Sequence, residues 1–455
     1  MPIIASSGPA TSDEFPVDGD EFNNMMGRCG PFEPVPHLAV GVSGGSDSLA
    51  LTLLTADWAK AQGGSLTALT VDHGLRSGAR AEAGRVAAWL GGHGIGHHVL
   101  RWTGPKPETG IQAAARRARY HLMSRWCRRH GVLHLLLGHQ REDQAETYML
   151  RRARDSGPDG LACMPGISET PWLRMVRPFL GVPRARLRAV LEARGQEWIE
   201  DPSNRNPAFA RVRVRAALAA ADDGEPGIDR LSTTTREHGR ARRVLDTQTA
   251  GLLARAVSIQ PAGYCRFDIG MIASAPEDIG MRALAHMVTC IGGQEYGPRR
   301  ERLERLYRAL RDDGLRRPRT LAGCVIAPRR GTGLVVREIR AAGPELNLKP
   351  GVEAVWDGRF RVRTGFFAGN GRQISIGALG RAGWAGLTAI RPEARKTAIP
   401  PLARPSLPVL RDQDGLLAAP HLGYCRDGAR ADRLESLELR FFPGNVLALA
   451  AFSVV

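Results

Sequence analysis

The sequence predicts an α/β protein in which a parallel-sheet domain is followed by a mainly helical domain and a small β-rich carboxyl-terminal domain. Between residues 37 and 154, short apolar runs alternate with helical stretches, a pattern typical of a parallel sheet covered on both faces. After about residue 220 helical stretches predominate, and from about residue 346 Gly and Pro separate short segments of alternating polarity. A chain of 455 residues is long enough for several such domains.

Four strand–helix units build the predicted parallel sheet. Ligands bind at the carboxyl ends of the strands in such sheets, so polar residues directly after each strand are candidates for a site. The units comprise residues 37–42 with 46–62, 65–71 with 79–90, 97–102 with 111–129, and 133–137 with 142–154.

The other segments complete the predicted domain organisation. Residues 1–35 are rich in Pro, Gly and acidic side chains and show no apolar period, which predicts a disordered extension. Helices are expected at 230–255, 276–290 and 299–312, and a hairpin at 319–339. The predicted domains span residues 36–220, 221–340 and 341–455.

The charge of the chain predicts a polyanionic partner. The formal net charge is +17, and only four of the 63 basic residues are lysine. Guanidinium groups suit bidentate recognition of phosphate. Codon bias explains any single arginine equally well, so the inference depends on the net charge.

Cysteine spacing and hydropathy exclude several protein classes. The seven cysteines include no C-x-x-C pair, which argues against a disulfide framework, a thiolate zinc site and an iron–sulfur motif. No apolar run is long enough to span a bilayer, and the amino terminus lacks the basic and apolar regions of a signal peptide. We therefore expect a cytoplasmic protein without membrane contact.

The segment between the first strand and the first helix is the most specific signal. Glycines there let the backbone approach a ligand, hydroxyl groups donate hydrogen bonds, and the helix start offers free amides to an anion. The segment fits neither G-x-x-x-x-G-K-[ST] nor G-x-G-x-x-G. Its residues are Ser43, Gly44, Gly45, Ser46, Asp47 and Ser48.

The presence of Asp47 in this segment indicates a bound cation, because its carboxylate would otherwise repel the phosphate beside it. Mg²⁺ held by Asp47, directly or through water, would remove that repulsion. The alternative is an ordinary Ser/Asp helix cap after a glycine turn.

Residues 43–48 resemble the SGGxDS pyrophosphate loop of the ATP pyrophosphatases, the PP-loop superfamily with its Rossmann-like domain. The resemblance implies an enzyme that cleaves ATP between the α- and β-phosphates and activates a substrate oxygen as an adenylate. The superfamily also includes GMP, NAD and argininosuccinate synthetases and tRNA thiolases.

Four further stretches, in the same order along the chain, resemble the tRNA(Ile)-lysidine synthetase family. They are residues 71–76, 115–120, 138–147, and 200–204 with Phe209 and 211–215. The resemblance adds Asp72 and His73 to the ATP site and makes Asp47 and Asp143 the catalytic candidates, with Asp143 a second candidate Mg²⁺ ligand. It assigns contacts with substrate or tRNA phosphate to Arg116, Arg119, His139, Glu146, Arg211 and Arg215.

Each of these positions also has a structural alternative. Asp72 and His73 could belong to a turn that ends the second strand. Arg116 and Arg119 share a helix face that could simply be solvated, and Asp143 could cap a helix start.

The chain departs from the family pattern at four positions. Gln140 and Glu142 replace a His and an Asp, Cys163 stands where a Gly is usual, and Val212 stands where an Asn is common. Asp143 is therefore the safer catalytic prediction than Glu142.

The resemblance implies a two-step reaction in which ATP adenylates the C2 oxygen of the wobble cytidine in an isoleucine tRNA with a CAU anticodon. The ε-amine of free lysine then attacks C2 and displaces AMP. The partners implied are this tRNA, L-lysine, ATP and Mg²⁺, and both a monomer and a homodimer are compatible with the sequence. The basic carboxyl-terminal half would hold the tRNA backbone.

Three other functions remain as alternatives. A tRNA thiolase of the same superfamily would typically need paired cysteines, which the sequence lacks. A small-molecule amidotransferase or ligase would not need the strongly basic carboxyl-terminal half. A non-enzymatic RNA-binding protein would not need the intact loop together with Asp143.

Overall fold

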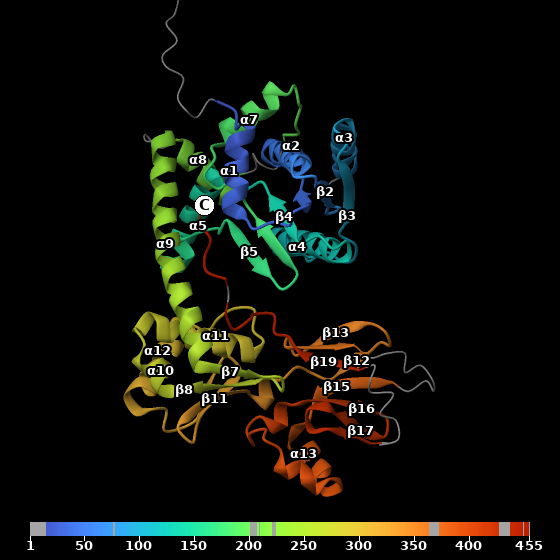
Figure 1. Ribbon diagram of the computed structural model, residues 1–455, viewed down its shortest axis with the longest axis vertical. Coiled ribbons are helices and arrows are strands. Elements are labelled where there is room, and N and C mark those ends of the chain that lie inside the picture. The colour runs from blue at the N-terminus through green and yellow to red at the C-terminus, as the bar shows by residue number, and fades with distance from the viewer. Residues whose placement is uncertain are drawn as a thin grey trace, which may run out of the picture. The chain divides into compact units, whose positions relative to one another are not determined.

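The computed structural model describes residues 15–75, 78–200, 207–208, 210–220, 224–363, 373–426, 437–448 and 450–454 (Figure 1). The chain forms two compact units. The first contains residues 1–244 together with 450–455, and the second contains residues 245–449. The division falls inside a long helix, α9, so the domain boundaries expected near 220 and 340 stay predictions.

The first unit is built on a six-stranded sheet with the order β3-β2-β1-β4-β6-β5. The first five strands in that order run parallel and β5 is antiparallel to β6, which confirms the predicted parallel sheet. The strands are β1 (His37–Gly41), β2 (Ser65–Asp72), β3 (Gly96–Arg101), β4 (His134–Leu137), β5 (Ile167–Thr170) and β6 (Leu173–Val176).

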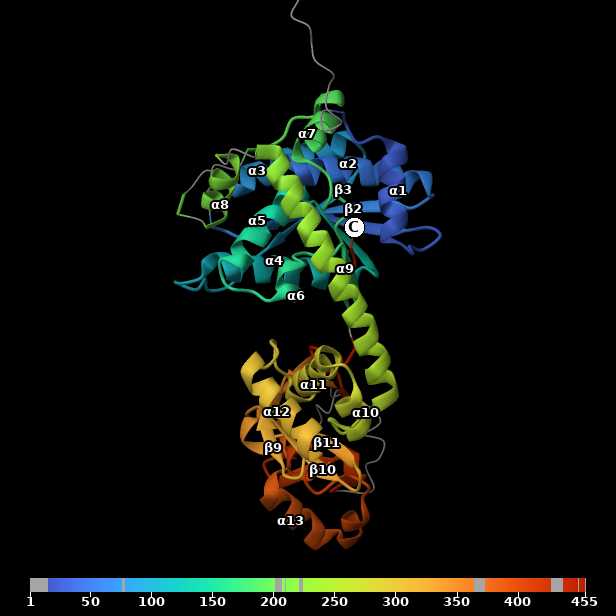
Figure 2. The same ribbon diagram turned by 90° about the vertical axis from the view of Figure 1, so that its left-hand side faces the viewer.

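Helices cover both faces of this sheet (Figure 2). Alternate residues of β1 point to opposite faces: Leu38 and Val40 pack with α1, α2, α3 and α7, whereas Ala39 packs with α4. The helices of this unit are α2 (Ser46–Ala61), α3 (Ala79–Gly92), α4 (Ile111–Arg129), α5 (Arg141–Arg152), α6 (Pro158–Leu161), α7 (Arg184–Ala193), α8 (Ala210–Ala219) and the start of α9 (Gly224–Ala256).

The expected disordered extension is wrong for the part of residues 1–35 that the structure describes. Gly19–Cys29 forms α1, and Asp18 caps it by accepting a hydrogen bond from the Glu21 N–H at 2.8 Å. Phe22, Met25, Met26 and Cys29 are buried on one face, where Phe22 meets the Phe179 ring at 5.8 Å. The apolar residues of this segment have the spacing of a helix. The surrounding Pro, Gly and acidic residues instead gave the segment a composition typical of disorder. Residues 1–14 lie outside the described part.

The second unit combines helices with antiparallel sheets. Its first sheet has the order β7-β8-β11-β10-β9, and α11 packs against it. The predicted hairpin at 319–339 is confirmed, because β10 pairs with β11 from Cys324↔Arg337 to Arg329↔Thr332. The elements are β7 (Val257–Gln260), β8 (Tyr264–Asp268), α10 (Ile269–Ser274), α11 (Glu277–Gly292), α12 (Arg300–Asp313), β9 (Arg319–Leu321), β10 (Cys324–Arg329) and β11 (Thr332–Arg337).

Two further antiparallel sheets, of five and three strands, follow in the region predicted to be β-rich. They have the orders β12-β15-β16-β17-β18 and β13-β14-β19. Asp357 ties the second of them to β11, since its carboxylate binds Arg337 and Arg359, each at 2.7 Å. The elements are β12 (Leu346–Leu348), β13 (Glu353–Trp356), β14 (Phe360–Arg363), β15 (Ile374–Ala378), α13 (Gly380–Ile390), β16 (Pro408–Asp412), β17 (Gly415–Ala419), β18 (Tyr424–Cys425) and β19 (Glu438–Phe441).

Among the described residues, none of the helices combines the length and the apolar character that crossing a membrane requires.

Candidate active site

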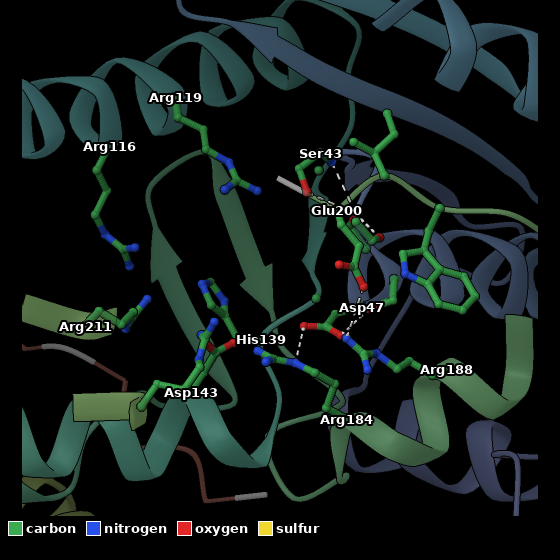
Figure 3. Close-up of a pocket in the computed structure, with 18 residues that line it drawn as sticks. Ser43, Asp47, Arg116, Arg119, His139, Asp143, Arg184, Arg188, Glu200 and Arg211 are labelled. Carbon is green, nitrogen blue, oxygen red and sulfur yellow. Dashed lines mark hydrogen bonds and ion pairs between the residues drawn. The ribbon is translucent and has the colours of Figure 1, made fainter. Parts of the chain in front are cut away.

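A cavity of about 650 Å³ opens in the first unit at the carboxyl ends of β1 and β4 (Figure 3). This is the sheet edge at which the sequence placed the site. Of the residues predicted for the site, the following line the cavity: Ser43, Gly45, Ser46, Asp47, Ser48, Arg116, Arg119, His139, Asp143, Arg211 and Arg215.

The loop between β1 and α2 is held in one conformation by its own hydrogen bonds. Ser48 Oγ accepts from the Ser43 N–H at 3.2 Å and donates to the Gly45 carbonyl at 2.9 Å. Gly44 has φ +88°, and a Cβ there would lie 2.8 Å from Ile199 Cδ1, so only glycine fits. Gly44 therefore shapes the loop from behind and does not line the cavity. The N-cap residue of α2 is Gly45, which has no side chain to cap the helix, so the positive end of α2 stays open toward the cavity.

Glycine also brings β4 close to this loop. A Cβ on Gly138 would lie 2.9 Å from the Asp47 carbonyl oxygen and 3.1 Å from Ser48 Cα. The end of β4 thus touches the first turn of α2, which brings the residues that follow β4 beside the loop. The two matching stretches around Asp47 and Asp143 consequently form one site.

Asp47 lies in a charged and largely buried position. Its Oδ1 accepts a hydrogen bond from Ser46 Oγ at 3.0 Å, and its Oδ2 lies 3.5 Å from Arg184 Nε. Burial raises the pKa of Asp47; Arg184 opposes that shift and the neighbouring Asp143 carboxylate adds to it. The two carboxylates are therefore close enough to repel each other.

Asp143 performs two tasks at the start of α5. Gln140 Oε1 accepts from the N–H groups of Glu142 and Asp143, at 2.6 and 3.3 Å, while Asp143 Oδ2 accepts from the Gln140 N–H at 3.3 Å. This capping box fixes the start of the helix. Asp143 also lines the cavity, so its role in the cap does not exclude a role in the site, and its catalytic role stays a prediction.

The replacement at Glu142 has a structural explanation. Both of its carboxylate oxygens lie 3.2 Å from the backbone nitrogen of Arg184, which donates to them at the start of α7. Glu142 is not among the residues that line the cavity. Asp143 is thus the carboxylate of this pair that faces the site.

Cys163 occupies a backbone conformation that favours glycine. Its φ is +57°, in the left-handed region. This conformation gives a physical reason for a glycine at the position, and the cysteine here carries the steric cost of its side chain. Val212 is half-buried on α8, and nothing further in the structure accounts for it.

Four of the predicted arginines line the cavity. Arg116 and Arg119 come from α4, and Arg211 and Arg215 come from α8. Glu146 does not line the cavity; its buried carboxylate lies 3.3 Å from Arg211 Nε and 2.6 Å from Arg215 Nε. Glu146 therefore holds two of these arginines in place.

His139 is uncharged in this environment. Burial lowers the pKa of its imidazole well below the ordinary value, and the positive charges of Arg177, Arg119, Arg116 and Arg211 lower it further. Within the described part of the chain, Nδ1 of His139 is buried without a hydrogen-bond partner. The ring of His139 lines the cavity and adds no positive charge to it.

Asp72 and His73 stand at the end of β2 but do not line the cavity. Asp72 Oδ1 accepts from the Gly74 N–H at 2.9 Å, and the His73 ring lies edge-on to Trp102 at 6.0 Å. The expected turn is present, and a role of the pair in ATP binding stays a prediction. Arg76, residues 201–204 and Phe209 of the matching stretches lie outside the described residues.

Two cationic side chains of the cavity were not predicted from the sequence. Arg184 and Arg188 of α7 line the cavity across from Arg116, Arg119 and Arg211 (Figure 3). Trp198, Ile199 and Glu200 line it as well. Their spacing of four residues places them on one helix face, a signal that the sequence contains. Arg186 lies between them and instead pairs with Glu21 at 2.6 Å, so charge alone did not single them out.

Comparison with known proteins identifies the family. The PP-loop domain model matches residues 20–221. The tRNA(Ile)-lysidine synthase of Ruegeria pomeroyi is 37% identical over 412 residues, which cover 90% of this chain and 94% of that protein. This chain belongs to the tRNA(Ile)-lysidine synthase family. The enzyme of that name from Rhizobium meliloti is 38% identical over 345 residues, 72% of this chain and 73% of that protein.

Membership of the tRNA(Ile)-lysidine synthase family confirms the resemblance inferred from the five matching stretches. The PP-loop match begins at residue 20, inside α1, which agrees with the packing of that helix into the first unit. Among solved structures, the U34-tRNA thiolase NcsA from Methanococcus maripaludis is similar over 48% of this chain and 77% of that chain, with 16% identity and a TM-score of 0.42. That likeness is too distant to bear on function.

Proposed function

We propose that this protein ligates L-lysine to the wobble cytidine of the CAU anticodon of isoleucine tRNA, with ATP as co-substrate and AMP and pyrophosphate as products. The similarity to tRNA(Ile)-lysidine synthases over nine-tenths of the chain carries the proposal. The modified tRNA would decode isoleucine codons instead of the methionine codon. It would be charged with isoleucine instead of methionine.

The loop at the start of α2 is the proposed site of the ATP phosphates. Its hydroxyl groups, its amides and the positive end of the helix would stabilise negative charge on the departing pyrophosphate. Adenylation would then place AMP on the C2 oxygen of the cytidine. Asp72 and His73, at the end of the neighbouring strand, are proposed to contact the nucleotide from the side.

Asp47 and Asp143 suit a bound Mg²⁺. Burial raises the pKa of Asp47 and the charge of Asp143 adds to that shift, and a cation held by these carboxylates would remove the repulsion. Two carboxylates are sufficient for Mg²⁺ when substrate phosphates and water supply the other oxygen ligands. The ion would supply charge neutralisation at the phosphates.

The second step needs a lysine whose ε-amine has lost its proton. Asp143 is the proposed acceptor of that proton, since its side chain lines the cavity. His139 is neutral and adds no charge that would repel the incoming amine. AMP would leave as the nitrogen bonds to C2.

The tRNA must present an unpaired base, as an anticodon loop permits. We propose that Arg116, Arg119, Arg211 and Arg215 contact substrate or tRNA phosphates around that base. In the second unit, Arg299, Arg300, Arg316, Arg317 and Arg330 are exposed and are proposed to hold the tRNA backbone.

We place the reaction in the cytoplasm, and light scattering would distinguish a monomer from a homodimer.

Transfer of radiolabelled lysine to unmodified isoleucine tRNA with a CAU anticodon tests the proposal. The reaction contains ATP and Mg²⁺, with elongator methionine tRNA as the control substrate and Asp47→Ala as the control enzyme. Label on the isoleucine tRNA alone, lost in Asp47→Ala, is the expected result. Cleavage of ATP without label on this tRNA would point to another acceptor or nucleophile.

A further inference from the structure

Helix α7 forms one side of the cavity directly beside the phosphate loop. Its apolar residues Leu187, Val190 and Leu191 share a core cluster with Leu49 and Leu53 of α2. Arg184 and Arg188, on the adjoining side of α7, extend into the cavity, where both side chains point toward Asp47 and Glu200 (Figure 3). The packing of α7 on α2 therefore fixes these arginines close to the loop.

Arg184 is held from two directions. Its backbone nitrogen donates to the Glu142 carboxylate at 3.2 Å, which fixes the first residue of α7. Its guanidinium Nε lies 3.5 Å from Asp47 Oδ2, and Arg188 Nη2 lies 3.9 Å from Glu200 Oε1. The backbone of Arg184 is thus tied down, whereas the two charge contacts in the cavity are long and easily exchanged.

Arg215 and Arg184 differ in the position of the carboxylate that pairs with each. Arg215 is bound at 2.6 Å by Glu146, whose side chain is 1% exposed and lies behind the cavity wall. Arg184 instead depends on Asp47, a residue of the cavity itself. A cation that binds Asp47 would compete with Arg184 for the same carboxylate. The guanidinium would then be left without its partner, facing the site of the ATP phosphates.

We propose that α7 provides the pyrophosphate side of the cavity, with Arg184 exchanging Asp47 for the β- and γ-phosphates when metal-bound nucleotide enters. Arg188 likewise exchanges Glu200 for these phosphates, and it binds them more weakly than Arg184 does. The four arginines of α4 and α8 are left for the RNA and the amino acid. This inference depends on the proposed function for the identity of the nucleotide, and it assigns the phosphates to one particular side of the site.

Binding measured without tRNA or lysine tests this assignment. The probes are α,β-methylene-ATP with Mg²⁺, inorganic pyrophosphate with Mg²⁺, and AMP. The first cannot be cleaved between its α- and β-phosphates. Arg184→Gln should weaken both polyphosphate probes by about 10- to 100-fold, the range of one charge-assisted hydrogen bond, while AMP binding stays within about twofold. Arg184→Lys should recover part of the loss, because the charge remains.

Arg194→Gln is the matched control. Arg194 follows the same helix and forms an ion pair of 2.8 Å with Asp57 outside the cavity, so none of the probes should change. Electron paramagnetic resonance measures the binding of Mn²⁺ without nucleotide. This gives a second test, in which the expected change in affinity is an increase and not a decrease. Arg184→Gln should bind Mn²⁺ more tightly than wild type, because Asp47 has lost its competitor, whereas a misfolded variant would bind it less.

Unchanged polyphosphate binding in Arg184→Gln would overturn the inference, and so would an equal loss for AMP. Weaker Mn²⁺ binding by the variant would overturn the exchange at Asp47. These outcomes are separate from a failure of the proposed function, in which the wild-type protein binds the polyphosphate probes normally but transfers no lysine to isoleucine tRNA.

Discussion

Glu146 Oε1 accepts a hydrogen bond from Arg215 Nε at 2.6 Å, and this contact joins α5 to α8 at the wall of the cavity. The second oxygen, Oε2, lies 3.3 Å from Arg211 Nε. A single buried carboxylate therefore determines where two of the proposed phosphate-binding side chains lie. Because Asp143 stands three residues earlier on α5, the same helix also carries the proposed proton acceptor.

Replacing Glu146 with Gln should impair both stability and substrate binding. The amide cannot neutralise two guanidinium groups, so we expect the free energy of unfolding to fall by about 1–3 kcal/mol. With Arg211 and Arg215 less ordered, the KM for tRNA should rise more than the KM for ATP. Urea unfolding and steady-state kinetics measure the two effects. Glu192→Gln, an exposed position on α7, is the control and should change neither quantity.

Gly44→Ala should distort the phosphate loop. The new Cβ would lie 2.8 Å from Ile199 Cδ1 at a φ of +88°, and we expect a loss of about 1–3 kcal/mol of stability and weaker ATP binding. Gly45 is the matched control. Its φ is −77° and a Cβ there would lie 3.7 Å from Ser43 Oγ, an ordinary van der Waals contact, so Gly45→Ala should cost about 1 kcal/mol or less. Equal losses in both variants would show that the contact with Ile199 is unimportant.

Asp47→Asn should raise the stability of the ligand-free protein while abolishing its activity. Burial raises the pKa of Asp47, so its ionisation disfavours the folded state. Between the unfolded and folded pKa values the folded protein binds more protons, and stability therefore falls as pH rises through that window. The variant should have the higher Tm at neutral pH, and the difference should disappear below the ordinary aspartate pKa of about 3.9.

Mg²⁺ should affect the Tm of wild type and the Tm of Asp47→Asn differently. Mg²⁺ should raise the Tm of wild type, because it binds the folded state, and leave the Tm of Asp47→Asn nearly unchanged. The exposed partner of Arg194 supplies the control, since Asp57→Asn should keep the response to Mg²⁺. An equal rise in all three proteins would place the metal elsewhere.

His139→Gln should flatten the acid side of the stability profile. The pKa of His139 is lowered by burial and by four arginines, so the folded protein keeps the ring neutral while the unfolded chain protonates it. Stability from this group is present above the unfolded pKa of about 6.5 and is lost as pH falls below it. Glutamine does not titrate, so the difference in unfolding free energy between pH 7.5 and about pH 5.5 should shrink. His37→Gln, at an exposed position, should leave it unchanged.

The sequence predicted the parallel sheet and the loop of residues 43–48 because both depend on local patterns. Asp47 and Asp143 were predicted to share a site because each follows a strand of one sheet. Spacing could not show that Glu142 turns to α7, or that Glu146 lies behind the wall, since both facts depend on neighbouring helices. Arg184 escaped notice for the same reason, because its partner is 137 positions away along the chain.

Helix α1, which was not predicted from the sequence, should contribute strongly to the stability of the first unit. Phe22 of α1 is 1% exposed and packs on Phe179, so Phe22→Ala should lower the free energy of unfolding by about 3–5 kcal/mol. Phe15, four residues before the start of α1, is 60% exposed, and Phe15→Ala should cost about 0.5 kcal/mol or less. Urea unfolding of the two variants compares a core contact with an exposed aromatic of the same type. A small loss at Phe22 would mean that α1 packs only weakly on the sheet, and that the catalytic unit begins at β1.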